Sequence, residues 1–535
     1  MKVSAQEVWL NNSRSDKWGF LAAGLGSLMV AVSICSGAAP TQEATGPIWP
    51  TKEWQTSSPE EQGMDSKELA KLVDFGTMHG FDSLMVVRHG KMVAEAYYAP
   101  SSAGIPHAVR SVTKAVISTL MAIVSKDGLL DSPSHRVLDF FDHRNIANLD
   151  DRKEAITVQN LLDMTSGMAW IQPPYGTAPS VIEMERSPDW VRFILDRPMS
   201  SAPGDSFNYS DGNAQLVSAI ITKLTGMSAL EYAKVKLFAP LGINEVFWPH
   251  DPQGISMGGY GLNLQPRDVA KIGYLYLRKG VWEGQELLPP AWIDKVSHAT
   301  VDVHGESGLR YSNLFWALLD KHVYMAVGAY RQVIMVFPDL DIVAVTTGRA
   351  DNYPLSEFAD SISRSVKSDM SLPPDAAGAK LLANKILDVS TEKPTEVGLT
   401  SRMATIISGK VYRFPPNEIN LKSVSLILTG SQPSYDMEIY ARDATKSGRR
   451  LTGPIGLDGL YRKGELTYHG FNDRFEELPR VSVVKGTWED DHTFVIDRLI
   501  LGQGPAEQWT FTFDGEKLNV VVDGREISAD GKTGG

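Results

Sequence analysis

The chain has 535 residues, of which 43% are hydrophobic. Single hydrophobic cores usually stop growing beyond about 250 to 300 residues, so we expect two domains. The 52 basic and 64 acidic residues give a net charge of -12, and no cluster of Lys and Arg is present that would bind a phosphate backbone. The composition therefore excludes nucleic acid as an expected partner.

The N-terminal segment has the pattern of a secretory leader. An apolar run, Trp18 to Ile34, is preceded by basic residues and followed by small residues at 36–39. We expect residues 1–40 to act as a signal peptide or, if uncut, as a membrane anchor. This order of basic, apolar and small residues predicts a periplasmic or secreted protein, or one anchored in the inner membrane.

Cys35 is the only cysteine, and the bulky Ile34 before it does not favour lipidation. A mature chain cut after Cys35 would contain no thiol, which excludes a disulfide framework, a cysteine nucleophile and a thiolate metal site. The 11 histidines are scattered and show no metal-ligand spacing. We therefore expect neither a metal nor another cofactor.

Residues 41–370 show the pattern of a mixed domain. A helical pattern at 64–79 is followed by strand-like runs at 83–88 and 91–98, which suggest a hairpin. Further helices are predicted at 111–127, 158–163, 189–195, 214–225 and 266–278, and adjacent strands at 323–327, 333–337 and 342–347. This is typical of an α+β fold with helices against an antiparallel sheet.

The composition and the secondary-structure pattern of the sequence change after residue 370. Residues 371–400 form a polar, proline-bearing stretch with a short helical pattern, which we interpret as a linker. Residues 401–535 contain short alternating strands separated by Gly, Asp and Asn turns. We therefore predict a separate all-β C-terminal domain.

The helix predicted at 111–127 begins with the sequence Ser-Val-Thr-Lys. Side chains at i and i+3 share a helix face, so Lys114 can reach the hydroxyl of Ser111 and activate it. Apolar neighbours would desolvate the amino group and favour its action as a base. The same spacing at Ser390 and Lys393 lies in the polar linker, where we expect a solvated turn.

Two later segments supply further candidates. Tyr209 lies in the loop before the helix at 214–225, where it could shuttle a proton between Ser111 and a leaving group or could simply cap the core. Gly328 and Ala329 precede the strand at 333–337, and the glycine would let a substrate carbonyl approach. The N–H groups of Ser111 and Ala329 are the predicted oxyanion hole.

These three segments, in this order, resemble the motifs of the serine β-lactamase and penicillin-binding-protein family, over roughly residues 50 to 365. Asp211 stands where that family usually has Asn, and Ala326 stands where it has Lys or His. The missing cation argues against β-lactamase or transpeptidase activity. The sequence at 328–332 is closer to the branch of 6-aminohexanoate-dimer hydrolases and family VIII carboxylesterases, which cleave linear amides and esters.

The resemblance implies a β-lactamase-like domain, an antiparallel sheet with helices on both sides, followed by a small lipocalin-like barrel. It implies an acyl-enzyme at Ser111 that acts on amide bonds of small linear peptides or oligoamides. The oligomeric state is left open by the sequence. The expected substrate contacts are Trp170, Asp211, Tyr260, Gly328 and Tyr330, of which Trp170 and Tyr260 could equally be ordinary packing residues.

Three alternatives remain open. The chain could be a carboxylesterase for small esters, or a penicillin-binding-type protein that forms an acyl adduct with little turnover. The sequence around Ser256 also matches the Gly-x-Ser-x-Gly elbow of α/β-hydrolases. That elbow needs a strand before the serine and a helix directly after it, whereas Pro252 precedes and several glycines follow.

Overall fold

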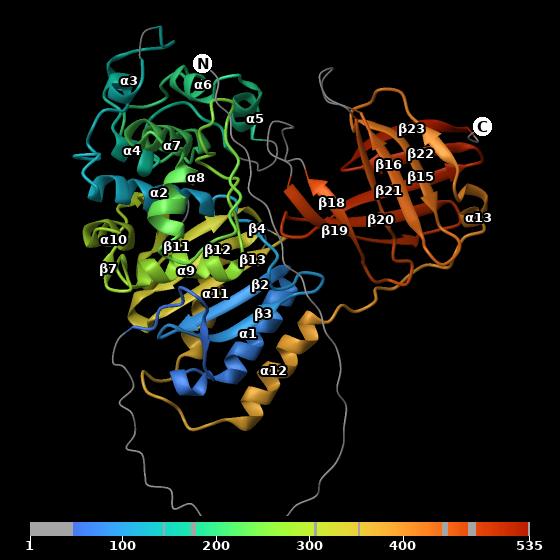
Figure 1. Cartoon of the computed structure of the whole chain (residues 1–535), viewed down its shortest axis with the longest axis horizontal. Helices are drawn as coiled ribbons and strands as arrows, with labels where there is room; N and C mark the ends of the chain where they lie inside the picture. The colour runs from blue at the N-terminus through green and yellow to red at the C-terminus, as the bar shows by residue number, and fades with distance from the viewer. Residues whose placement is uncertain are drawn as a thin grey trace, which may run out of the picture. The chain divides into compact units, whose positions relative to one another are not determined.

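The computed structural model describes residues 47–142, 145–172, 178–303, 308–350, 354–440, 448–468 and 478–532. The predicted leader, residues 1–40, lies outside the described residues. Pro47–Gly535 is one compact unit with two large sheets, each with its own hydrophobic core (Figure 1). No helix among the described residues is long and apolar enough to cross a membrane.

The first sheet has nine strands in the order β1-β3-β2-β13-β12-β11-β10-β9-β8. Every pair is antiparallel except β1 with β3. The strands are β1 Gln55–Thr56, β2 Phe81–Arg88, β3 Lys91–Tyr97, β8 Val301–Asp302, β9 Leu309–Ser312, β10 Phe315–Leu318, β11 Val323–Gly328, β12 Gln332–Phe337 and β13 Ile342–Gly348.

Helices cover both faces of this sheet. Arg88 of β2 donates to the carbonyls of Gln62 and Ser368, beside α1 (Ser66–Met78) and α11 (Leu355–Ser365). Successive strand residues point to opposite faces. On the opposite face, Val343, which pairs with Val87, packs on α9 (Pro266–Leu277), and α9 contacts α2 (Val112–Lys126). The predicted antiparallel sheet with helices on both sides is confirmed, with one parallel pair added.

The other helices of this domain lie above the α2 side of the sheet in Figure 1 or at its edge. They are α3 Asp151–Glu154, α4 Val158–Leu162, α5 Pro179–Arg186, α6 Trp190–Leu195, α7 Asp211–Thr225, α8 Ala229–Ala233 and α10 Pro290–Ser297. Short strands β4 (His107–Ala108) and β5 (Asn263–Leu264) pair with each other and lead into the candidate site.

The segment expected to be a linker contains a 15-residue helix, α12 (Ala376–Ser390), which packs against α1. Lys67 and Lys385 form ion pairs with Asp375 and Asp74 at 2.6 and 2.8 Å, and Leu382 is buried. A helix that packs on the outside of a domain buries only a few apolar side chains. Its polar composition therefore resembles that of a linker.

The C-terminal module contains helix α13 (Met403–Ile407) and a ten-stranded antiparallel sheet in the order β17-β16-β15-β14-β23-β22-β21-β20-β19-β18. The all-β prediction is confirmed, but no ladder among the described residues joins the end strands β17 and β18 into a closed barrel. The strands are β14 Val411–Arg413, β15 Leu421–Ile427, β16 Ser434–Ile439, β17 Arg449–Pro454, β18 Arg462–Tyr468, β19 Leu478–Trp488, β20 Thr493–Ile500, β21 Glu507–Asp514, β22 Lys517–Val522 and β23 Arg525–Lys532.

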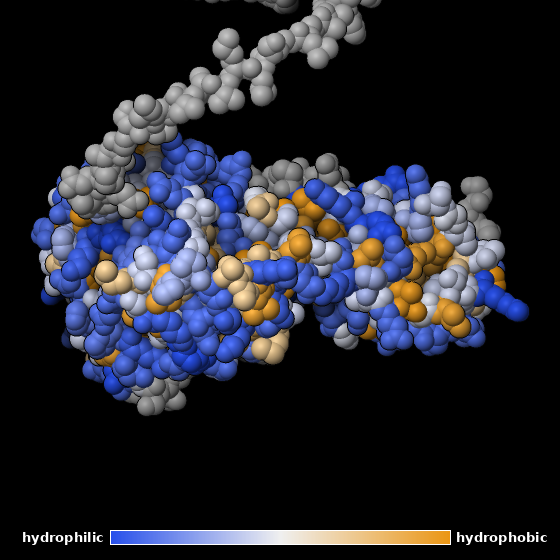
Figure 2. Space-filling model, turned by 90° about the horizontal axis from the view of Figure 1, so that it is seen from below, coloured by the Kyte–Doolittle hydropathy of each residue, from blue (hydrophilic) through white to orange (hydrophobic). Residues whose placement is uncertain are grey.

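One face of the molecule is mostly hydrophilic, with smaller apolar areas between the polar side chains (Figure 2). This agrees with a chain in which 22% of the residues are charged. Scattered apolar side chains of this kind are normal on protein surfaces.

Candidate active site

Ser111 occupies the N-terminal end of α2, where its hydroxyl is next to the amino group of Lys114. Ser111 is 8% exposed and Lys114 is 1% exposed. The Nζ of Lys114 donates to the Ser111 Oγ at 3.0 Å. One helical turn therefore brings the predicted nucleophile and its predicted base into direct contact.

Lys114 has two more partners. Its Nζ donates to Oδ1 of Asp211 at 2.5 Å and to the carbonyl oxygen of Gly259 at 2.7 Å. An ammonium group has three N–H donors and no acceptor, and here three acceptors surround it. This geometry is that of a charged ammonium in a buried ion pair with Asp211.

Tyr209 lies two residues before Asp211, and its ring stacks on Trp316 with centroids 5.6 Å apart. The Lys114 Nζ lies 4.7 Å from the centre of the Tyr209 ring. Burial and the charge of Asp211 raise the pKa of Tyr209, while a hydrogen bond to Ser111 acts in the opposite direction. Tyr209 is therefore a phenol with a proton to donate.

Gln172 completes the surroundings of Asp211. Its Nε2 donates to Asp211 Oδ2 at 2.7 Å, and its Oε1 accepts from the backbone N–H of Asp211 and from Trp170 Nε1. Trp170 is 6% exposed, and its ring lies directly over Gly212. Both oxygens of Asp211, expected to contact substrate, are thus bonded within the protein. Gln172 was not singled out from the sequence, where no motif marks it.

The end of β11 approaches the nucleophile closely. A Cβ on Gly328 would lie 2.6 Å from the carbonyl oxygen of Val109 and 3.0 Å from the backbone nitrogen of Ser111. Ala329 follows directly, and the chain then turns through the left-handed region at Tyr330, with a φ of 59°. Only glycine allows the strand and the nucleophile turn to approach in this way.

Tyr260 is partly buried beside the Lys114 site, since it follows Gly259. Its hydroxyl donates to Oε1 of Glu185 on α5 at 2.5 Å. Burial and the nearby carboxylates, Glu185 first, raise the pKa of Tyr260. This bond ties α5 to the loop whose carbonyl holds Lys114.

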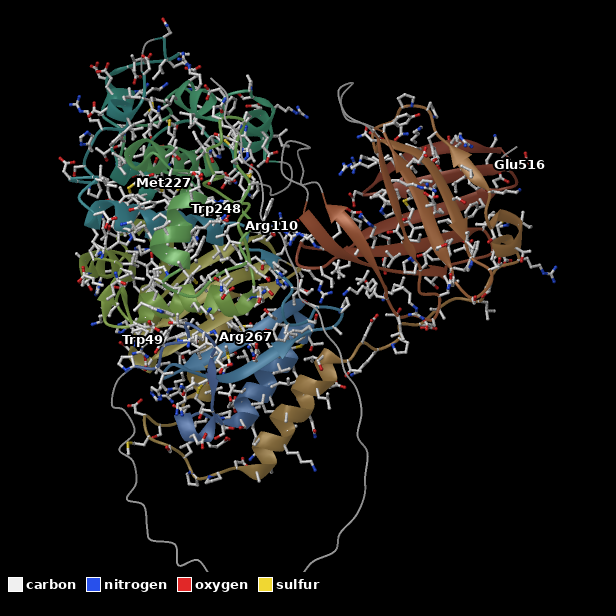
Figure 3. All side chains as sticks on the ribbon, viewed as in Figure 1. Trp49, Arg110, Met227, Trp248, Arg267 and Glu516 are labelled. Carbon is white, nitrogen blue, oxygen red and sulfur yellow. The ribbon has the colours of Figure 1, made fainter. Side chains whose placement is uncertain are left out.

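Residues of the C-terminal module contact both sides of the site. Arg110, labelled in Figure 3, donates to the carbonyl of Gln503, and its guanidinium lies 5.4 Å from the Tyr330 ring centre. A Cβ on Gly504 would lie 3.0 Å from the same ring. Tyr330, expected to contact substrate, therefore packs between Arg110 and the module. The residue before Ser111 and the residue after Ala329 are both held by this segment.

The rival serines have other surroundings. Ser256 is buried, and its hydroxyl accepts from the backbone N–H of Leu230 at 3.0 Å. The residues directly before and after it form neither a strand nor a helix, so no nucleophile elbow is built there. Ser390 ends α12, and Lys393 pairs with Asp388 instead.

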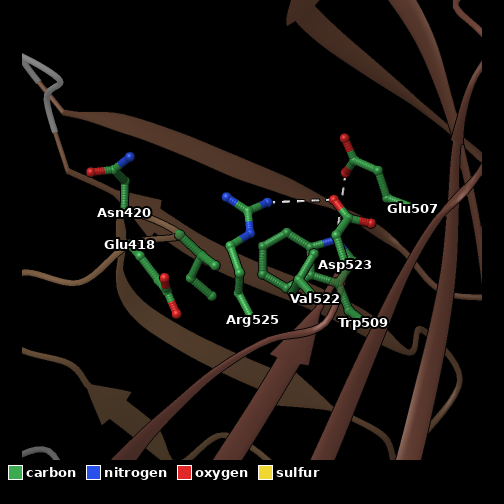
Figure 4. Close-up of a pocket in the computed structure, with 8 residues that line it drawn as sticks. Glu418, Asn420, Glu507, Trp509, Val522, Asp523 and Arg525 are labelled. Carbon is green, nitrogen blue, oxygen red and sulfur yellow. Dashed lines mark hydrogen bonds and ion pairs between the residues drawn. The ribbon is translucent and has the colours of Figure 1, made fainter. Parts of the chain in front are cut away.

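The C-terminal module has a separate cavity of about 430 Å³ (Figure 4). Glu418, Glu507 and Asp523 line it together with Trp509 and Arg525, and Arg525 pairs with Asp523 at 3.4 Å. This lining offers no pair of nucleophile and base. Across the described residues, no group of three or more His, Cys, Asp or Glu side chains could hold a metal ion.

Comparison with known proteins identifies the family of the chain. The family model described as Beta-lactamase matches residues 74–357, more than half of the chain. The chain belongs to the β-lactamase family.

Two curated relatives are similar over shorter stretches. A 6-aminohexanoate-dimer hydrolase of Paenarthrobacter ureafaciens is 22% identical over 227 residues, 40% of this chain and 56% of that protein. Protein flp of Staphylococcus aureus (strain N315) is 26% identical over 215 residues, 37% of this chain and 41% of that protein. The chain thus spans about half the length of these relatives. The solved structure of EstCE1, a hydrolase with promiscuous acyltransferase activity, has a TM-score of 0.48 at 18% identity, covering 57% of this chain and 99% of that one.

Proposed function

We propose that the protein is an exported serine hydrolase that cleaves amide bonds of small linear peptides or oligoamides. The observation that carries the proposal is the buried hydrogen bond of 3.0 Å from Lys114 to the hydroxyl of Ser111. A serine hydroxyl becomes a nucleophile only with an adjacent base, and this pair is the one the chain builds on a rigid helix.

In the proposed reaction, Ser111 Oγ attacks the substrate carbonyl and the N–H groups of Ser111 and Ala329 stabilise the oxyanion. The C–N bond then breaks as Tyr209 gives a proton to the leaving nitrogen. Water then hydrolyses the acyl-enzyme. The enzyme takes a proton from the attacking water, and a proton returns to Ser111 Oγ as this oxygen leaves.

Tyr209 is the reason to prefer amides over esters. An amine leaves from a tetrahedral intermediate only after its nitrogen is protonated. An alkoxide whose parent alcohol has a low pKa can leave without a proton. The raised pKa of Tyr209 keeps the phenol protonated until this step. The name of the 6-aminohexanoate-dimer hydrolase relative also describes hydrolysis of a linear oligoamide.

Export and the form of the C-terminal module belong to the same proposal. The apolar run Trp18 to Ile34 with basic residues before it supports a leader at 1–40 and a periplasmic or secreted location, with an uncut leader giving membrane anchoring. An apolar core that side chains from most of the ten antiparallel strands share supports a lipocalin-like barrel. The partner we propose is a small amide or peptide, with small esters as the second substrate class.

The test is intact-mass labelling of the purified protein with a fluorophosphonate, comparing the wild type with Ser111→Ala and Ser256→Ala. We expect one adduct in the wild type and in Ser256→Ala, and none in Ser111→Ala. Matched amide and ester substrates with the same acyl group then measure the preference. Labelling that persists in Ser111→Ala would contradict the proposal. A stable acyl adduct formed from the amide or the ester, without turnover of either substrate, would favour a binding protein.

A further inference from the structure

Asp211 holds a position that the proposed reaction does not yet use. Its carboxylate is 7% exposed, and one of its oxygens lies 2.5 Å from the Nζ of Lys114. We propose that Asp211 is the final proton acceptor during acylation, so that the base is a Ser111–Lys114–Asp211 relay. This inference rests on the proposed function of Ser111.

The count of donors around Lys114 leads to this conclusion. The Nζ donates to Ser111, Asp211 and Gly259, which uses all three N–H groups of an ammonium. An ammonium cannot accept the hydroxyl proton of Ser111 unless it gives up one of its own protons in the same step. Of its three acceptors, a hydroxyl and a peptide carbonyl are very weak bases, and only the Asp211 carboxylate can take that proton.

The atoms and electrons balance in this scheme. In one concerted step, a proton moves from Lys114 Nζ to Asp211 Oδ1, and the lone pair that this frees on Nζ takes the Ser111 hydroxyl proton. In the same step the Oγ–C bond forms and the carbonyl π electrons move to oxygen. Asp211 then holds the proton, and Lys114 is an ammonium again.

Collapse of the intermediate restores the site. The C–N bond breaks, and Tyr209 gives its proton to the leaving nitrogen. Lys114 returns a proton to the phenolate and receives the proton held by Asp211. Lys114, Asp211 and Tyr209 end in their starting states, Ser111 carries the acyl group, and no external acid or base is consumed.

Burial makes the transfer accessible in energy. Desolvation penalises both charges of a buried ion pair, so a neutral amine and acid at 2.5 Å are much closer in energy to the ion pair than they would be in water. Gln172 Nε2, which donates to the other carboxylate oxygen at 2.7 Å, favours the charged resting state and holds the carboxylate in line with Lys114.

The other titratable groups around Asp211 do not compete for this proton. Burial and Asp211 raise the pKa of Tyr209 on the adjoining loop, so it stays a phenol. Tyr260, on the loop that carries Gly259, also stays a phenol because burial and Glu185 raise its pKa. Glu185 of α5 accepts from the Tyr260 hydroxyl and lies behind it. Lys114 and Asp211 are therefore the pair that exchanges a proton.

The first test is Asp211→Asn, which keeps the shape and removes the acceptor. We measure the second-order rate of fluorophosphonate labelling at Ser111, and kcat on an amide, from pH 4 to 11. In the wild type the rate requires the carboxylate of Asp211 as proton acceptor, whereas in Asp211→Asn it requires the free amine of Lys114. Because an amine is a stronger base than a carboxylate, the acidic limb of the rate moves to higher pH in the variant, and the neutral rate falls about 100-fold or more.

Asp251→Asn is the matched control. Asp251 is also a buried carboxylate, and it accepts from Gln215 at 3.1 Å and from the backbone N–H groups of Gln253 and Ile255 at 2.9 Å. Its variant should keep the wild-type acidic limb. An unchanged limb in Asp211→Asn, with only KM altered, would assign Asp211 to substrate binding and overturn the relay.

A measurement on the wild type covers the case in which Asp211→Asn does not fold. Two protons move during acylation in a relay, so the labelling rate in mixtures of H2O and D2O should fall along a curve that is quadratic in the deuterium fraction. A straight line would mean that one proton moves, and the relay would be wrong. Failure of the Ser111 assignment is recognised separately, because the label would then survive Ser111→Ala.

Discussion

Gly328→Ala tests whether the close approach of β11 to the nucleophile forms the oxyanion hole. The backbone of Gly328 has a φ of −119°, which any residue adopts, so the new methyl group acts only by its size. Its carbon would lie 2.6 Å from the Val109 oxygen, 0.4 Å inside the 3.0 Å that real contacts respect. The strand end and the turn at Ser111 must therefore separate by about that much or more. Overpacking of this kind costs roughly 1–3 kcal/mol of stability.

The rate should suffer more than the stability. Oxyanion donors act at about 2.7–3.1 Å from the developing charge, and the loss of one such donor costs about 100- to 1,000-fold in rate. We expect the fluorophosphonate labelling rate of Gly328→Ala to fall by about 10- to 1,000-fold. Gly273→Ala is the control, because its Cβ would crowd Ile334 and Val343 at 2.7 Å in the core beneath the sheet. Equal labelling rates in the two variants, after correction for folded fraction, would refute the reasoning.

Two further predictions concern Tyr209 and Lys153. Tyr209→Phe should lower kcat on an amide by about 100- to 10,000-fold and kcat on the matched ester by much less, because only the amine requires protonation to leave. Paired steady-state assays on the two substrates measure this difference. An equal loss of kcat on both substrates would exclude the proposed acid role. Lys153, fully buried, donates to the carbonyls of Ala147, Leu195 and Arg197 at 2.7–2.9 Å. Lys153→Met leaves these carbonyls unpaired and should lower the free energy of unfolding by about 3 kcal/mol in urea titrations, while the labelling rate of the folded protein stays the same. A loss below about 1 kcal/mol would show that water replaces the three hydrogen bonds.

The pairing of Ser111 with Lys114 could be predicted because it is local. Both residues belong to one helix, and the periodicity of that helix fixes which side chains meet. The central strands could be predicted for a similar reason, since runs such as 342–347 consist of residues that fit a strand buried on both faces. These features depend on neighbours in the sequence and not on the rest of the fold.

The contacts of Asp211 could not be predicted in this way. Its partners come from α2, from residue 172 and, through Gly259, from a loop about 50 residues further along. The replacement of Asn by Asp did carry a signal, because a buried carboxylate needs a cation and Lys114 is the nearest one the motifs supply. The helical pattern at 376–390 was interpreted as part of a linker for a different reason: its ion pairs with α1 are formed across about 300 residues of chain.

Ala326 links the site to the choice of substrate. It is 2% exposed and pairs with Ile334 across the sheet, so this position presents no cation beside Ser111. The guanidinium of Arg110 is already engaged with Gln503 and the Tyr330 ring. The charge of Lys114 is balanced by Asp211 inside the protein. Lys114 and Arg110 are thus both engaged with protein partners, which supports the proposal of an uncharged linear amide as substrate.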